Sequence, residues 1–299
     1  MSVAKQTDKP VLMLSNQSSG FNEEIQAIMA AAEVPLLQGT REGLTAVDNL
    51  IKYSEFLQKP TPDFKVEPNK EAHALLPEGS VVLNEYDSKQ LVAKYGVPIT
   101  EENLCGSKEE TLKSAAKFGY PVVLKLISKD IQHKTEAGVV RLKLKDQAAV
   151  AKAYDEVVAN AKAYKPDAEV QGVLCYKMVE EPVTEAIVGV LSDPYFGPAV
   201  VFGLGGIMVE VIKDRALLIP PISREEARTA IDSTKGSKLL YGFRGKPKAD
   251  VEALVDVIVK AGEMTADLAD RIDALDINPL LILSEGKGVV AVDALVALK

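Results

Sequence analysis

The sequence has few of the residues from which metal sites and disulfide frameworks are built. Its 299 residues include only two cysteines, Cys105 and Cys175, and two histidines, His73 and His133. Two histidines cannot form a His-rich metal site. Neither cysteine belongs to a CxxC pattern, so we expect reduced thiols in a cytoplasmic protein. His73 falls in a proline-rich stretch, where we expect a solvated side chain without a chemical role.

Long apolar runs and an excess of positive charge are also missing. No run of 18 or more apolar residues exists, so we expect no membrane-spanning helix. The first ten residues, MSVAKQTDKP, contain no apolar signal-peptide core. The formal net charge of −8 argues against a nucleic-acid partner, because phosphate binding requires a basic face. The composition, 47% apolar and 26% charged, is that of a soluble globular protein with one large domain or two moderate ones.

The first 57 residues predict a small α/β segment. Residues 10–16 and 34–39 form short apolar strands, and each is followed by an amphipathic helical stretch. Alternation of strands and helices is typical of a parallel, doubly wound sheet. Two strands are too few for such a sheet, so this segment must complete a sheet with another part of the protein.

Residues 58–79 contain four prolines and little periodicity, which predicts a linker. Residues 80–299 predict a larger mixed α/β domain. Two of its helices start with capping boxes, Ser107 with Glu110 and Ser223 with Glu226. We expect its helices at residues 84–96, 107–119 and 147–163, from residue 223, and at 250–272. We expect a strand that starts at residue 97, strands at 121–128, 139–145, 172–179 and 185–192, two short strands within 199–212, and a hairpin over 276–296.

Lys125 stands inside the apolar strand PVVLKLIS. Burying a lysine is costly unless the amine meets a negative charge, and a nucleotide phosphate would supply one. A snorkelling lysine on a half-exposed strand is the structural alternative.

The segments next to this strand contain further candidates. The loop SKDIQHKTEAG offers His133 and Gly138, and a glycine there lets backbone N–H groups approach phosphates closely. A polar surface loop explains it equally well. The run FGLGG (202–206) is not a dinucleotide-binding fingerprint, because its glycine spacing is not GxGxxG and no helix follows it directly. A tight turn with or without a ligand fits that run.

The terminal hairpin brings oxygen-bearing side chains together. A turn centred on Gly286 and Lys287 places Leu280 opposite Asp293, with Asn278 at the diagonal position about 7 Å away. Asp276 shares that face through the period of two. Oxygen ligands next to phosphates are what Mg²⁺ requires. A polar, water-facing side of an edge hairpin is the alternative.

Several of these segments, taken in order, resemble one family. The pieces PVVLKLISKDIQHKTEAG, EAIVGVLSDPYFGPAVVFGLGGIMVEVIKD, LLYGFRGKP and DINPLLI are similar to the ATP-grasp part of NDP-forming acyl-CoA synthetases, over about residues 81–299. The resemblance implies an ATP-grasp fold of two subdomains. Residues 10–57 resemble the tail of the ligase domain that precedes ATP-grasp in fused members. The remaining domains of such enzymes have no counterpart in this sequence.

The resemblance also implies a reaction, acyl-CoA + NDP + phosphate ⇌ acid + CoA + NTP, through an acyl phosphate and a phosphohistidine. Mg²⁺ and ATP or ADP are the implied cofactor and substrate, with GTP as an alternative nucleotide. The implied partner is a CoA-binding, phosphohistidine-bearing subunit, through which CoA and a small carboxylic acid bind. Its implied site residues are Lys125 on the phosphates, Gly138 in the phosphate-covering loop, Met178 near the adenine, Glu185 on the nucleotide, Asn278 and Asp293 on Mg²⁺, and His133 as a phosphoryl relay.

Four positions depart from the family pattern. Val139 replaces a second glycine, Leu218 stands near a usual arginine, Leu295 replaces the arginine of Asp-Ala-Arg, and Tyr176 stands where glutamine is common. Each missing arginine removes a bidentate, charge-assisted phosphate contact. A non-catalytic or regulatory ATP-grasp subunit is therefore the second hypothesis. A ligase that joins a carboxylate to an amine also fits the fold, but it leaves residues 10–57 unexplained.

Overall fold

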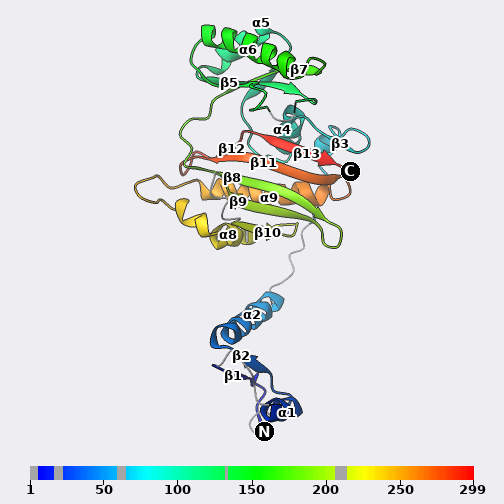
Figure 1. Ribbon diagram of the computed structural model, residues 1–299, viewed down its shortest axis with the longest axis vertical. Helices are drawn as coiled ribbons and strands as arrows, with labels where there is room; N and C mark the ends of the chain where they lie inside the picture. The colour runs from blue at the N-terminus through cyan, green and yellow to red at the C-terminus, as the bar shows by residue number, and fades with distance from the viewer. Residues whose placement is uncertain (1–5, 17–22, 59–64, 132–133, 206–213) are drawn as a thin grey trace. The chain divides into compact units, whose positions relative to one another are not determined.

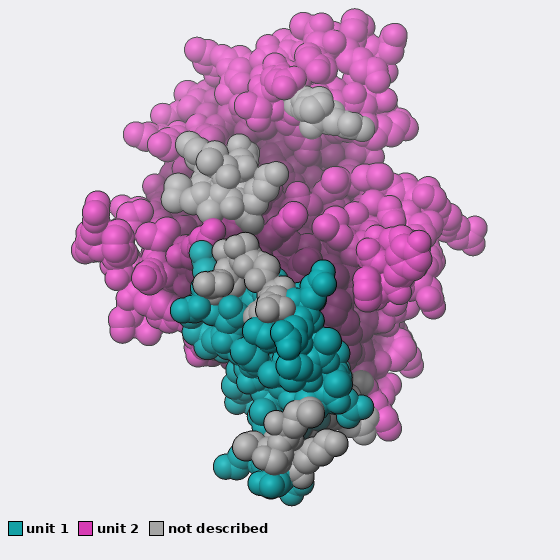
Figure 2. All heavy atoms as spheres, turned by 60° about the horizontal axis from the view of Figure 1, so that its bottom comes forward, with its two compact units in different colours: residues 1–63 teal, residues 64–299 magenta. Residues whose placement is uncertain are grey.

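The computed structural model describes residues 6–16, 23–58, 65–131, 134–205 and 214–299. The chain forms two compact units, residues 1–63 (unit 1) and residues 64–299 (unit 2), coloured separately in Figure 2. The boundary between them falls inside the stretch 58–79, for which we expected a linker. Part of that stretch forms helix α3 (Lys70–His73) of unit 2.

Unit 1 has the expected order of strand, helix, strand and helix. Its elements are β1 (Met13–Ser15), α1 (Glu23–Ala31), β2 (Leu36–Gln38) and α2 (Thr40–Gln58). The two strands pair in parallel, with Met13 opposite Leu36. Helix α2 approaches them at Gly43, where a Cβ atom would lie 2.1 Å from Leu14 Cδ1. Only glycine permits this contact.

Unit 2 contains two antiparallel sheets. The larger has seven strands in the order β10-β9-β8-β11-β13-β3, with β12 paired to β11, and the smaller has the order β4-β7-β5-β6. The strands are β3 (Val81–Val82), β4 (Glu102–Cys105), β5 (Val122–Ser128), β6 (Val140–Leu144), β7 (Val170–Lys177), β8 (Thr184–Asp193), β9 (Gly197–Leu204), β10 (Arg215–Leu218), β11 (Ile272–Ile282), β12 (Val289–Ala291) and β13 (Ala294–Leu298).

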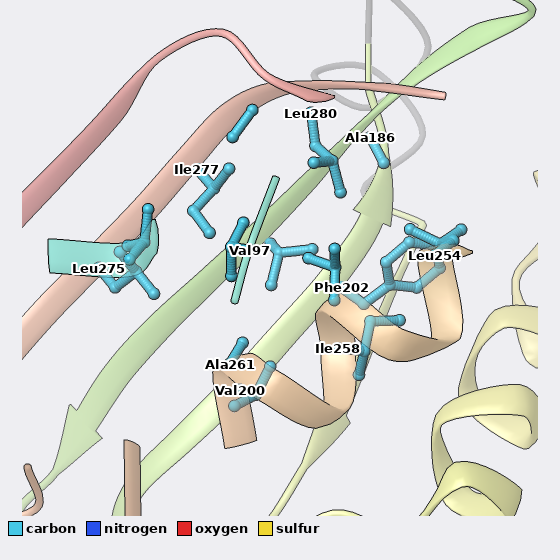
Figure 3. Close-up of a cluster of buried hydrophobic side chains, with 14 of the residues drawn as sticks. Val97, Ala186, Val200, Phe202, Leu254, Ile258, Ala261, Leu275, Ile277 and Leu280 are labelled. Atoms are coloured by element: carbon cyan, nitrogen blue, oxygen red, sulfur yellow. The ribbon is translucent and has the colours of Figure 1, made fainter. Parts of the chain in front are cut away.

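Helices cover one face of each sheet. Beyond α3, the described residues of unit 2 form the helices α4 (Glu85–Lys94), α5 (Lys108–Phe118), α6 (Gln147–Tyr164), α8 (Arg224–Ser233), the 3₁₀ helix η2 (Lys235–Leu239) and α9 (Val251–Asp267). In Figure 1, α5 and α6 lie on the smaller sheet, and α8 and α9 lie on the larger one. Figure 3 shows Phe202 of β9, Leu254 and Ile258 of α9, and Ile277 and Leu280 of β11 in one buried cluster.

The period of two decides which face of β5 holds each side chain. Val122, Leu124 and Leu126 pack in the core beneath α5 and α6. Val123 and Ile127 belong to a separate cluster on the opposite face, where Tyr86 of α4 also packs. Lys125 lies between them in the alternation and therefore shares this second face. Residues 178–183 connect β7 of the smaller sheet to β8 of the larger one.

Some predicted boundaries were wrong. The strand expected from residue 97 is only an isolated bridge at Ile99, and the strand of this region, β4, starts at Glu102. The long helix ends at Asp267, not at 272. The Ser223–Glu226 capping box is confirmed. Ser107 also caps its helix, but its Glu110 carboxylate accepts a hydrogen bond from the Gly106 amide instead of completing a box.

The predicted register of the terminal hairpin was also wrong. Leu280 pairs with Ala291, not with Asp293. The turn is closed by Leu283 N donating to Gly288 O at 3.0 Å, so its centre lies one residue earlier than we expected. Gly286 and Gly288 both adopt positive φ, which fixes the turn at this position. Among the described residues, no helix is long and apolar enough to cross a membrane.

Candidate functional site

A cleft of about 570 Å³ separates the inner faces of the two sheets in unit 2. Charged and polar side chains line most of it. The lining residues are Lys125, Lys134, Thr135, Glu136, Val140, Leu142, Tyr176, Asp276, Asn278, Asp293 and Leu295. The strand containing Lys125 and the terminal hairpin, two regions singled out in the sequence, therefore meet at one place.

Three oxygen-bearing side chains enter the cleft from the larger sheet. Leu275 and Ile277 of β11 are buried in the core, so Asp276 and Asn278 project to the other face. Asn278 N donates to Asp293 O at 3.2 Å, which places Asn278 directly opposite Asp293. The convergence of Asp276, Asn278 and Asp293 on one face is confirmed.

The Lys125 amine meets two carboxylates. Its Nζ lies 2.8 Å from Glu85 Oε1 and 2.8 Å from Asp293 Oδ2. Burial alone would lower the pKa of Lys125, but the Glu85 and Asp293 charges outweigh burial and raise it. The lysine is therefore a fixed cation on the wall of the cleft.

Glu85 holds this cation from the first turn of α4. Its Oε2 accepts a hydrogen bond from Lys134 Nζ at 2.6 Å, while Oε1 accepts from Lys125. Burial tends to raise the pKa of Glu85, but Lys125, Lys134 and Lys89 together lower it. One buried carboxylate thus positions two lysines that line the cleft.

Lys89 extends the network behind the cleft. Its fully buried amine bonds to Glu102 Oε2 and to Val292 O, the latter at 3.0 Å. It also lies 5.1 Å from the ring centroid of Tyr176. Glu102 Oε1 is buried and has no hydrogen-bond partner among the described residues, and burial raises the pKa of this carboxyl group.

The carboxyl groups of Asp276 and Asp293 lie close enough to affect each other's ionisation. Burial raises the pKa of Asp276, and the nearby Asp293 charge raises it further, while a hydrogen bond from Asn278 opposes both. A cation between these groups would relieve the repulsion. The donors are hard oxygens, which fit Mg²⁺. In the described ranges no cluster of three or more His, Cys, Asp or Glu could hold a metal alone. Mg²⁺ commonly binds through one or two carboxylates, with substrate phosphates and water as its other ligands.

The remaining predicted site residues lie outside this lining. Gly138 N donates to Thr135 O at 3.1 Å, and its φ of +62° explains the glycine. Met178 packs beside the inner face of the smaller sheet, at the start of the connection to the larger one. Gly189 of β8 pairs with Asp276, and Glu185 stands four residues before it on the same strand, so Glu185 shares the sheet face of Asp276. His133 lies outside the described residues.

The four departures from the family pattern have different surroundings. Val139 is fully buried beneath α5 and α6, and Leu218 packs in the core of the larger sheet. Tyr176 is buried on the cleft wall, where burial raises the pKa of its phenol. Only Leu295 combines high exposure, 50%, with a place in the cleft. Leu295 is therefore the departure with the most direct consequence for a bound phosphate.

Glu85 and Lys89 were missed from the sequence. Both lie on the buried side of α4, with Ser88, Leu91 and Val92. Two charged residues four apart on the apolar stripe of an amphipathic helix are the signal that indicates a buried polar network.

Comparison with known proteins agrees with this architecture. A family model described as ATP-grasp domain matches residues 74–298. The beta subunit of ADP-forming acetate–CoA ligase II from Pyrococcus furiosus is 43% identical over 79% of this chain and 99% of the relative. The ADP-forming 4-hydroxybutyrate–CoA ligase of Nitrosopumilus maritimus is 34% identical over 93% of this chain, but this match spans only 41% of that enzyme.

A solved structure is similar in fold. It is the dinucleotide-forming acetyl-coenzyme A synthetase 1 of Candidatus Korarchaeum cryptofilum in complex with coenzyme A and Mg-AMPPCP, with a phosphohistidine segment pointing towards the nucleotide-binding site. The TM-score is 0.64 at 34% identity, over 73% of this chain and 93% of that one. The chain therefore belongs to the ATP-grasp family, in the group of the ADP-forming acyl-CoA ligases.

Proposed function

We propose that the chain is the nucleotide-binding subunit of an NDP-forming acyl-CoA synthetase, which interconverts acyl-CoA, ADP and phosphate with acid, CoA and ATP. The cleft carries this conclusion, because it sets two lysines against three oxygen-bearing side chains. Phosphoryl transfer depends mainly on positioning and charge neutralisation, and these are the two things such a cleft supplies.

The lysines supply the positive charge for the nucleotide. Lys125 contacts the phosphates, and Lys134 lies on the same wall of the cleft. A bound phosphate takes the place of Asp293 beside Lys125, while the buried Glu85 keeps both amines in position. Lys125 therefore stays paired with and without nucleotide, which avoids an isolated buried charge.

Asn278 and Asp293 hold Mg²⁺, with Asp276 beside them. When bound, the ion neutralises charge on the phosphoryl group. The chain keeps the two ligands fixed through the backbone hydrogen bond between Asn278 and Asp293. Burial and the nearby Asp293 charge both raise the pKa of Asp276, and a cation bound beside the two carboxylates reduces the repulsion between them. Mg-AMPPCP in the Korarchaeum cryptofilum structure supports this assignment.

The other predicted residues act at the edges of the nucleotide. Glu185 reaches it from the inner face of the larger sheet, and Met178 packs near the adenine where the chain passes between the sheets. Gly138 lies in the loop that contributes Lys134 and Thr135 to the cleft, so it belongs to the phosphate-covering loop. His133 relays the phosphoryl group.

The synthetase requires a second subunit that binds CoA and bears the main phosphohistidine. The phosphohistidine segment of the Korarchaeum cryptofilum enzyme, which points towards its nucleotide site, supports this division of roles. The complex works in the cytoplasm, because Cys105 and Cys175 are free thiols.

A non-catalytic, regulatory subunit is the second candidate. The observation that favours it is Leu295, which stands in the cleft where the family has an arginine. Such a subunit binds nucleotide but transfers no phosphoryl group.

Calorimetry with MgADP tests nucleotide binding. Lys125→Met is expected to weaken binding about 100-fold, because it removes a charge-assisted phosphate contact. Lys113→Met, on the exposed surface of α5, is the matched control and should bind like wild type. Circular dichroism confirms that both variants are folded. Equal affinity of Lys125→Met and wild type contradicts the assigned role.

Incubation with [γ-³²P]ATP, Mg²⁺ and the CoA-binding subunit tests transfer. The synthetase is expected to form an acid-labile, base-stable phosphohistidine, and His133→Ala is expected to reduce it. Nucleotide binding without label in any combination supports the regulatory candidate.

A further inference from the structure

The described residues of unit 1 form no hydrophobic core of their own. In its described ranges, 6–16 and 23–58, no apolar side chain is buried, and the only buried residues are Gly39 and Gly43. Six large apolar side chains of α2 are 52% to 64% exposed: Leu44, Leu50, Ile51, Tyr53, Phe56 and Leu57. Burial of apolar surface is the main driving force of folding, so unit 1 needs an external surface to stabilise it.

The exposed face of α2 continues its packed face. Gly43 contacts the strands, and Leu50 and Leu57 follow at intervals of seven residues, which return to nearly the same side of a helix. The 19 residues of α2 span about 28 Å. Strands of three residues span only about 10 Å. In Figure 1, α2 extends beyond β1 and β2, so its far end has no sheet beneath it among the described residues of unit 1.

The two-stranded sheet of unit 1 also has too few strands to be stable by itself. Within the described part of this unit, β1 and β2 pair only with each other, in parallel. Parallel sheets occur almost only with several strands and with both faces covered. More parallel strands beside this pair would give α2 the surface that it lacks.

The relatives indicate where those strands are found. The match to the Pyrococcus furiosus beta subunit covers nearly all of that subunit but only 79% of this chain, the share that unit 2 makes up. The match to the 4-hydroxybutyrate–CoA ligase covers 93% of this chain, so it includes most of unit 1, and it spans only 41% of that much longer enzyme. Unit 1 therefore corresponds to a part of the longer enzyme that the separate beta subunit does not have.

We propose that unit 1 completes an α/β domain of the CoA-binding subunit, adding two parallel strands and covering their sheet with α2. The inference rests on the proposed function for the identity of the partner. In the longer relative, the segment that matches unit 1 belongs to the same chain as the rest of the enzyme. In this proposal, unit 1 instead attaches the nucleotide-binding subunit to its partner.

A second copy of the chain fits this face less well. Most homodimers have twofold symmetry, which sets the same edge strand of each copy against the other in antiparallel orientation. Such a pair does not extend a parallel sheet under α2. A partner that supplies further parallel strands does.

Association with the purified CoA-binding subunit tests the proposal in the full chain. Leu50→Glu places a charge on the face of α2 that continues from Gly43, and it is expected to weaken association at least tenfold. Asn49→Glu adds the same charge elsewhere around the helix and is expected to leave association within twofold of wild type. Equal affinity of the two variants overturns the proposal.

Hydrogen exchange gives a second readout that does not depend on a variant. Amides of α2 and of β1 and β2 are expected to become protected when the CoA-binding subunit is added, and unchanged exchange contradicts the proposal. If the chain alone forms a dimer that Leu50→Glu disrupts, the exposed face of α2 binds a second copy of the chain, and the proposed partner is wrong. MgADP binding by wild type and by both variants is measured in parallel. If wild type does not bind MgADP, the proposed function is contradicted, whereas the association measurement still tests the docking of unit 1.

Discussion

Lys125 Nζ and Glu85 Oε1 lie 2.8 Å apart, and this buried ion pair joins the smaller sheet to α4. Glu85 also binds Lys134, so one carboxylate fixes both lysines of the cleft. The cleft is thus organised by an acidic residue that does not face the proposed nucleotide as a ligand. Preorganised charges of this kind need no rearrangement when a substrate binds.

Glu85→Gln is expected to destabilise unit 2 by about 3 kcal/mol, because it leaves buried lysines with fewer counter-charges. It also removes one negative charge from behind the cleft, so the net charge around the two lysines becomes more positive. MgADP should therefore raise the melting temperature of the variant more than that of wild type.

Thermal unfolding with and without MgADP measures both effects. Glu71→Gln, which removes an exposed ion pair to Lys94, is the control and should change the melting temperature little. A Glu85→Gln melting temperature equal to wild type would show that the pair is not structural.

Asp293→Asn is expected to raise the Mg²⁺ concentration for half-maximal ATP binding roughly tenfold, because a carboxylate ligand becomes a neutral amide. Calorimetry at a series of Mg²⁺ concentrations measures this shift. Asp273→Asn makes the same charge change on β11 outside the cleft lining and should behave like wild type. If Asp293→Asn changes only the affinity for Mg²⁺-free ADP, its contact to Lys125 explains the effect instead.

Asp267 provides a pH-dependent contribution to stability at the end of α9. Its side chain is 3% exposed and accepts hydrogen bonds from Tyr95 and the Asn69 amide, and it pairs with His73. Burial tends to raise the pKa of Asp267, but these contacts outweigh burial and lower it. The sequence predicted a solvated His73, whereas the structure pairs it with this carboxylate.

A carboxyl group whose pKa is lowered by folding stabilises the protein above its unfolded pKa, near 3.9, and the contribution is lost as the pH falls through the folded value. Asp267→Asn is therefore expected to cost roughly 2 kcal/mol at neutral pH, with the difference narrowing towards about pH 3. Urea unfolding across this range measures it. Asp155→Asn, exposed on α6, is the control. A constant difference at all pH values contradicts the linkage.

Local patterns predicted most of the fold. The apolar run at β5, the parallel pair in unit 1 and the Ser223–Glu226 box depend on residues close in sequence, and the structure has all three. Strand β4 was missed because its residues, ENLC, have low strand propensity, and pairing with β7 holds them extended. Whether such a segment forms a strand depends on its pairing with a distant strand and not on its local preference.

The candidate site was predicted in part. Lys125, Asn278 and Asp293 follow from a lysine in an apolar strand and from the alternation of a hairpin. The spacing of Glu85 and Lys89 on the apolar side of α4 indicates a buried polar network, but it does not identify Lys125, 40 positions away, as the partner of Glu85. The predicted hairpin register was wrong because Gly286 and Gly288, two residues apart, permit turns centred at neighbouring positions.

Leu295→Arg tests whether the missing arginine limits the cleft. Leu295 is 50% exposed and lines the cleft with Asp276 and Asn278, so an arginine there has room to reach a bound phosphate. A bidentate, charge-assisted contact is expected to tighten MgATP binding about tenfold. Leu239→Arg, on η2 and outside the cleft lining, is the matched control and should leave binding unchanged.

The same variant separates the two functional candidates. In a catalytic subunit, wild type already forms phosphohistidine with [γ-³²P]ATP, and Leu295→Arg increases the rate because more transition-state charge is neutralised. In a regulatory subunit, wild type forms none. Label that appears only with the arginine would then identify Leu295 as the substitution that removed phosphoryl transfer, whereas tighter binding without label would place the defect at another residue of the site.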